Sequence, residues 1–157
     1  MDEIQSGYGR TGKFWAFEHY SIIPDIVVCA KGMGGGMPIG AFISSHEIMQ
    51  TLTNDPVLGH ISTFGGHPLS AAAALATIEV IQEENLIPNV DSKAELFRDA
   101  LVHHNILGIR NKGLMMAVEF DSYQVLKPII DEAIKGGVIT DWFLFCDHSM
   151  RIAPPLT

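Results

Sequence analysis

DIVVCAKGMGGGMPIG, residues 25–40, is the stretch that decides the fold. It contains an unbroken apolar run with β-branched residues, 26–30, which predicts a strand buried on both faces of a parallel sheet. Lys31 ends the run. The glycines that follow it leave room for the backbone to pack closely around a ligand. A strand-end lysine that extends into water is the alternative interpretation of such a junction. The stretch therefore indicates an α/β fold with a lysine at the end of a central strand.

The composition excludes several classes of protein. The chain has 157 residues and a net charge of -8, with 10 Lys plus Arg against 18 Asp plus Glu. Without a basic cluster, this balance argues against a nucleic-acid partner and against an anionic membrane surface. Residues 56–78 form the longest uncharged run, but glycine, proline and histidine interrupt it, so it does not predict a membrane span. The two cysteines, Cys29 and Cys146, suggest reduced thiols and a cytoplasmic location.

Helical and strand patterns divide the chain into two domains. A helix is expected over residues 69–84, and Asn85 and Pro88 break its pattern. We therefore expect one domain over residues 1–88 and a small α/β domain over residues 89–157.

The smaller domain has its own pattern. A helix is expected from Val90, a half-buried strand over residues 114–120 and a second helix over residues 123–135. Gly136 and Gly137 follow in the role of a helix C-terminus. Short strand candidates lie further on, at residues 138–140, 143–146 and 150–153.

The chain opens on a polar, glycine-rich loop, residues 2–13, where a domain rarely begins. We expect a longer protein in which a preceding strand delivers Asp2. In the chain as given, that strand is expected to be missing.

Three stretches in this order resemble one family: DEIQSGYGRTGKFWAFEHYSIIPDIVVCAKGMGGGMPIGA, STFGGHPLSAAAALA and RIAPPLT. Together they are similar to the second half of class III pyridoxal-phosphate-dependent aminotransferases of the ornithine and acetylornithine type. The resemblance implies a fold type I transferase. The chain would comprise the rear of the large, cofactor-binding domain plus the small C-terminal α/β domain, incomplete at its end.

Lys31 is the catalytic candidate. Transamination needs an amine that condenses with the cofactor aldehyde and is then freed to move a proton at the substrate carbon. We expect Lys31 to be desolvated at the end of a buried strand, because burial favours the neutral, nucleophilic amine.

The resemblance assigns further roles in binding pyridoxal phosphate. Asp2 is implied to pair with the pyridine nitrogen, whose proton lets the ring withdraw electrons, and Gln5 to hydrogen-bond the phenolic oxygen. Glu3 is expected to be merely solvated. Thr63, with Ser62 beside it, is implied to bind the cofactor phosphate of the other copy, so the resemblance implies a homodimer with shared sites.

Arg151 matches an arginine that faces the substrate carboxylate, a task suited to its bidentate fork. A surface arginine paired with acids is the alternative. Arg10 is expected to have a structural role in its loop. His103 and His104 are adjacent and would point apart on a helix, so no metal site is expected.

The resemblance thus implies transfer of an amino group from an ornithine-like amino acid to a 2-oxo acid such as 2-oxoglutarate. An aminomutase or decarboxylase of the same fold is the first alternative, since fold and cofactor do not fix the reaction. A non-enzymatic assembly module is the second. Because much of the expected cofactor site lies outside these residues, we expect the 157-residue chain alone to be inactive.

Overall fold

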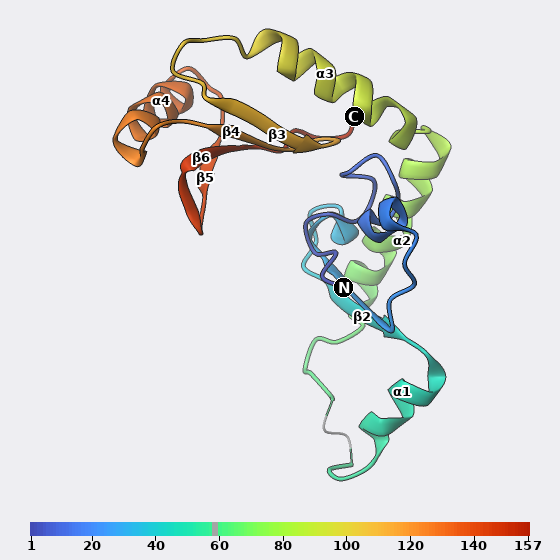
Figure 1. Ribbon diagram of the computed structural model, residues 1–157. Helices are drawn as coiled ribbons and strands as arrows, with labels where there is room; N and C mark the ends of the chain where they lie inside the picture. The colour runs from blue at the N-terminus through green and yellow to red at the C-terminus, as the bar shows by residue number, and fades with distance from the viewer. Residues whose placement is uncertain (58–59) are drawn as a thin grey trace. The chain divides into compact units, whose positions relative to one another are not determined.

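The computed structural model describes residues 1–57 and 60–157. The chain divides into two compact units, and the main division falls between Ile87 and Pro88. Residues 10–12 belong to the second unit, although their neighbours on both sides belong to the first. Figure 1 labels most of the helices and strands.

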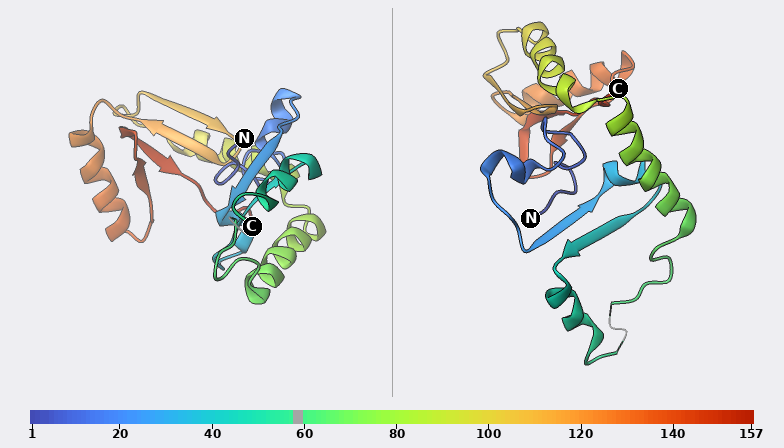
Figure 2. Two further views of the ribbon diagram at one scale, coloured as in Figure 1. Left: turned by 90° about the horizontal axis from the view of Figure 1, so that it is seen from below. Right: turned by 90° about the vertical axis from the view of Figure 1, so that its right-hand side faces the viewer.

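The first unit contains a two-stranded sheet formed by β1 (Ile26–Ala30) and β2 (Gly40–Ser44). The strands are antiparallel, with Ile26 opposite Ser44 and Ala30 opposite Gly40. Figure 2 shows them side by side. The remaining elements are the 3-10 turns η1 (Ala16–Tyr20), η2 (Lys31–Gly34) and η3 (Thr51–Thr53) and the helices α1 (His46–Gln50) and α2 (Pro68–Glu83).

Strand β1 is less enclosed than the sequence predicted. Its residues alternate, with Cys29 buried at 1% exposure while Ile26 and Val28 keep 39% and 36%. Within the part of the chain that the structure describes, its parallel pairing is a single bridge between Asp2 and Val28. The prediction of a strand buried on both faces of a parallel sheet is therefore wrong for this chain, because β1 pairs with β2 in antiparallel fashion and leaves one face partly open.

Helix α2 matches the helix expected over residues 69–84 to within one residue at each end, and Pro68 lies in its first turn. Its buried side chains are Ser70, Ala74 and Ile81, whereas Leu75 is 58% exposed. A Cβ at Gly35 would collide with the Thr77 hydroxyl of α2. The helix thus packs on the turn after Lys31 through its small residues, which explains why the large Leu75 faces outward.

The second unit contains an antiparallel sheet in the order β3-β4-β6-β5. Two helices and a short 3-10 turn accompany it. The elements are η4 (Ile87–Asn89), α3 (Val90–Ala100), β3 (Gly108–Lys112), β4 (Met115–Glu119), α4 (Tyr123–Lys135), β5 (Asp141–Phe143) and β6 (Cys146–Ile152).

The core of this unit lies between the two helices and one face of the sheet. Met116 packs with Val90 and Ala94 of α3, and Val118 packs with Leu126 of α4. Met116 and Val118 are alternate residues of β4 and share one face, so both helices cover that face. The predicted half-buried strand and the helix over residues 123–135 are confirmed.

Two strand predictions need correction, and one strand was not predicted. Residues 138–140 form no strand, residues 143–146 span the turn between β5 and β6, and β3 was not predicted. β3 reads GIRNK, which lacks an apolar alternation because it is an edge strand.

In the described residues, no helix combines the length and apolar character that crossing a membrane requires.

A substitution at Gly113 tests how closely residues 10–12 pack against the rest of the second unit. Its φ is +53°, and a Cβ there would lie 2.7 Å from Val90 Cγ1 and 2.8 Å from Arg10 O. We expect Gly113→Ala to lower the free energy of unfolding of this unit by about 3 kcal/mol, since strain and overpacking add. Gly137→Ala is the control: its φ is +87° and nothing lies within 4 Å. It should cost only about 1 kcal/mol in denaturant titrations. Equal losses for the two variants would contradict the packing.

Candidate functional site

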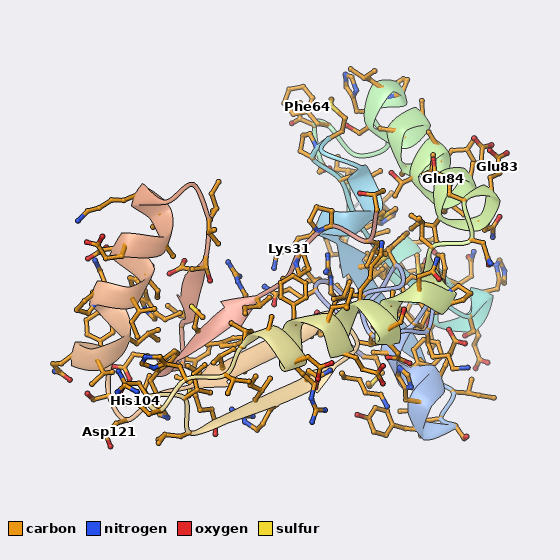
Figure 3. All side chains as sticks on the ribbon, turned by 90° about the horizontal axis from the view of Figure 1, so that it is seen from above. Lys31, Phe64, Glu83, Glu84, His104 and Asp121 are labelled. Atoms are coloured by element: carbon orange, nitrogen blue, oxygen red, sulfur yellow. The ribbon has the colours of Figure 1, made fainter. Side chains whose placement is uncertain are left out.

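Lys31 directly follows β1, where the chain turns sharply. Its φ is 48°, a left-handed conformation that is uncommon for a residue other than glycine, and it opens η2. The glycines after it carry no side chains, so little covers the lysine, and it is exposed. Figure 3 labels it. The expectation of a desolvated Lys31 is therefore wrong in this chain: its amine is presented to solvent at the end of a short strand.

Asp2 lies beside the same strand. The amide of Glu3 donates to Val28 O at 2.8 Å, and the amide of Val28 donates to Met1 O at 2.9 Å. Residues 1–3 thus run parallel to β1, with Asp2 opposite Val28. Asp2 is thus held by one bridge to β1, and the strand expected to precede it stays a prediction. The parallel direction sends both segments the same way, so Asp2 and Lys31 come from neighbouring segments of one small sheet.

The polar groups of Asp2 and Gln5 suit a cofactor with a pyridine ring. Asp2 Oδ1 accepts from the amide of Ile4 at 2.9 Å, a bond that uses one of the two carboxylate oxygens. A carboxylate can accept further bonds, so Asp2 can also accept from a protonated ring nitrogen. Gln5 is exposed and follows on the same turn. At Gly36 an added Cβ would meet nothing within 4 Å, so there is open space close to the turn that Lys31 begins.

Glu3 corrects another expectation, because it is buried at 1% exposure and not solvated. Its Oε2 accepts from Ser6 Oγ at 2.6 Å and from the amide of Ala16 at 3.1 Å. Its Oε1 accepts from the amide of Phe17 at 2.9 Å. The carboxylate therefore fixes the loop that carries Asp2 and Gln5 to the start of η1. An acid in a glycine-rich loop is not by itself a signal for this role, so sequence reasoning missed it.

Tyr8 packs against the turn that follows Lys31. It is 6% exposed, and its ring lies against Phe14 and Trp15 at centroid distances of 5.2 and 5.3 Å. Its hydroxyl lies 3.9 Å from Cys29 Sγ. Burial, and secondarily the nearby Cys29, raise the pKa of Tyr8. A Cβ at Gly32 would be 3.7 Å from Tyr8 Cβ, so the aromatic loop packs directly on the residue after Lys31.

Ser62 and Thr63 lie in the turn that precedes α2, and both are exposed. The Gly65 amide donates to Ser62 O at 3.4 Å, and the His67 amide donates to Phe64 O at 3.2 Å. Phe64, labelled in Figure 3, is 78% exposed. The turn thus offers hydroxyls to its surroundings, as a phosphate-binding segment would. Within this chain it makes local contacts and does not enclose Lys31.

Arg151 lies on β6 in the second unit and is exposed. Its backbone is fixed by pairing with Ala117 on one side and Asp141 on the other. The Thr140 hydroxyl donates to Arg151 O at 2.6 Å. The guanidinium therefore projects from a rigid strand, which suits a group that must present a bidentate fork.

Arg10 has the structural role expected of it, and the structure specifies that role. Its guanidinium donates to Pro154 O at 2.5 Å and to Leu114 O at 3.4 Å, and the Leu114 amide donates back to Arg10 O. Burial lowers the pKa of the guanidinium. Lys93 donates to Leu156 O in the same way. Two cations thus anchor the segment that follows Arg151, which the sequence did not predict.

His103 and His104 lie in a loop after α3, not on a helix. Their rings do not point apart: the centroids are 4.1 Å from each other. Among residues 1–57 and 60–157, no group of three or more His, Cys, Asp or Glu side chains could hold a metal ion.

The model of the class-III aminotransferase family matches residues 1–157. Among solved structures, the ornithine aminotransferase of Toxoplasma gondii is 34% identical with a TM-score of 0.86; the match covers 99% of this chain and 37% of that one. That protein was found with partial occupancy of PLP at its active site.

Two further solved structures are similar. An aminotransferase of Bacillus anthracis is 29% identical with a TM-score of 0.88, over 99% of this chain and 40% of that one. The N-acetylornithine aminotransferase of Stenotrophomonas maltophilia is 28% identical with a TM-score of 0.82, over 99% and 41%. The chain thus spans about two fifths of the length of these proteins.

Glu3 allows a direct test of the loop. All its partners are donors, so Glu3→Gln brings an amide NH₂ against backbone N–H groups. We expect the free energy of unfolding to fall by about 2 kcal/mol. Glu18→Gln is the matched control, because Glu18 is exposed and accepts one bond, from the Trp15 amide at 2.7 Å. It should change stability by about 0.5 kcal/mol or less. If the two variants unfold alike in urea, Glu3 does not hold the loop.

Proposed function

Because the chain belongs to the class-III aminotransferase family, we propose that the protein of which it forms part transfers an amino group from an ornithine-like amino acid to a 2-oxo acid such as 2-oxoglutarate. Class III aminotransferases depend on pyridoxal phosphate. The observation that supports the proposal is the parallel pairing of Asp2 with β1, the strand that ends at Lys31. The ornithine and acetylornithine aminotransferases among the structural relatives favour this class of donor.

In the proposal, bound pyridoxal phosphate supplies an electron-withdrawing ring that carries the amino group between the two substrates. Lys31 holds the cofactor through its side-chain amine, and once displaced it moves the proton at the substrate carbon. Asp2 keeps the ring nitrogen protonated, and Gln5 donates to the phenolic oxygen. The exposed Lys31 amine is accessible for both tasks.

Ser62 and Thr63 are proposed to donate hydroxyl hydrogens to the cofactor phosphate in the site of a second copy. Their exposure and local contacts fit a segment that serves a neighbouring site. Arg151 is proposed to bind the substrate carboxylate in bidentate fashion. These assignments make the working enzyme a homodimer with shared sites.

Incubation with pyridoxal phosphate tests Lys31. We expect the absorbance band of lysine-bound cofactor with the wild-type chain, and borohydride reduction followed by peptide mapping should place the label on Lys31. Lys31→Ala should lose the band. Lys13→Ala is the control, since Lys13 is an exposed lysine of the same unit. It should keep the band. Label spread over several surface lysines, and unchanged in Lys31→Ala, would contradict the assignment.

Turnover is expected only from the longer protein. We propose that the 157-residue chain alone forms no glutamate from ornithine and 2-oxoglutarate, because it spans about two fifths of the length of its solved relatives. Full-length protein should form glutamate, and Arg151→Ala should raise its KM for substrate by roughly tenfold or more. Carbon dioxide release without glutamate would instead support a decarboxylase, and an isomer without amino transfer a mutase.

A further inference from the structure

A second group of reactive side chains lies in the second unit, at the hairpin between β5 and β6 (Figure 1). Cys146 opens β6 and is partly exposed. Its sulfur lies 3.6 Å from His148 Nε2 and 3.2 Å from Ser149 Oγ. The Asp147 carboxylate lies 3.6 Å from His148 Nδ1. None of these four residues has a role in the proposed transamination.

The sheet fixes the backbone that carries this group. Ser149 is 0% exposed and pairs with Glu119 of β4. The amide of Phe120 donates to His148 O at 3.0 Å. Cys146 pairs with Phe143 of β5. The cysteine and histidine are therefore held near each other by strand pairing and not by the chance conformation of a free loop.

The arrangement suits a nucleophilic thiol. A neutral imidazole can accept the thiol proton, a carboxylate stabilises the imidazolium that results, and a hydroxyl can donate to the thiolate. His148 keeps 47% of its side-chain surface and Asp147 67%, so a small reagent can reach the group. Cys29 offers the contrast: it is 1% exposed, and its sulfur neighbours are Tyr8 and Met33.

We propose that Cys146 is a reversible modification site that exchanges with small disulfides and that His148 is its acid–base partner. The thiol proton passes to His148, and the sulfur of Cys146 attacks one sulfur of the disulfide. The S–S bond of the reagent breaks as the new S–S bond to Cys146 forms. The departing thiolate takes the proton back from His148, so one thiol and one disulfide yield a mixed disulfide and a small thiol.

The negative charge around Cys146 restricts which disulfides are expected to react with it. The Asp147 carboxylate lies against His148, which contacts the sulfur, and the whole chain carries a net charge of -8, so anionic disulfides are disfavoured relative to neutral or cationic ones. The site therefore fits a small neutral or cationic disulfide.

The test uses the full 157-residue chain and 2-hydroxyethyl disulfide, a neutral probe, with capping at each cysteine followed by peptide mass spectrometry. We expect Cys146 to be capped at least about tenfold faster than Cys29. His148→Gln should slow capping of Cys146 by roughly tenfold and leave Cys29 unchanged, because it removes the proton acceptor. His103→Gln is the control, a surface histidine of the same unit, and both rates should stay as in the wild type.

Asp147→Asn provides a second variant in case His148→Gln alters the hairpin. It keeps the shape of the side chain, and it should slow capping by about threefold, since the imidazolium loses its carboxylate. Equal capping of Cys146 and Cys29 in the native chain would overturn the proposal. So would a Cys146 rate that both variants leave unchanged.

Discussion

The short parallel pairing between residues 1–3 and β1 is the constraint on which the candidate site depends. Two backbone hydrogen bonds, from Glu3 to Val28 and from Val28 to Met1, fix the register of Asp2 against the strand that leads to Lys31. A shift by one residue would turn the Asp2 side chain to the opposite face of the sheet. The acid and the lysine come from separate segments of the sequence, so this register is what relates their positions.

Two buried groups keep the surrounding loop in place. The Glu3 carboxylate gathers three donors in the first unit, and Tyr8 fills the space beneath the turn after Lys31. Arg10, a few residues further on, belongs instead to the second unit, where it anchors the segment after Arg151. The glycine-rich loop over residues 7–12 therefore has several structural roles. The residues expected to take part in chemistry, Asp2 and Gln5, lie just before it.

Local patterns predicted most elements because the side chains themselves carry the signal. The alternation around Met116 and Val118 and the pattern that ends at Gly136 each correspond to an observed strand or helix. The partners of β1 were not predictable in this way, because a continuous apolar run is compatible with several sheet environments. The edge strand β3 lacks an apolar pattern, and the burial of Glu3 depends on donors up to fourteen residues away. Sequence motifs named Lys31 and Asp2, but only the fold shows one exposed and the other supported by β1.

Amide hydrogen exchange of the 157-residue chain, followed by NMR with and without pyridoxal phosphate, tests the central claim most directly. The parallel pairing predicts slow exchange at the amides of Glu3 and Val28, because both are hydrogen-bonded, and slower exchange still if pyridoxal phosphate binds at the proposed site. Exchange at these two amides as fast as in an unfolded chain would contradict the account.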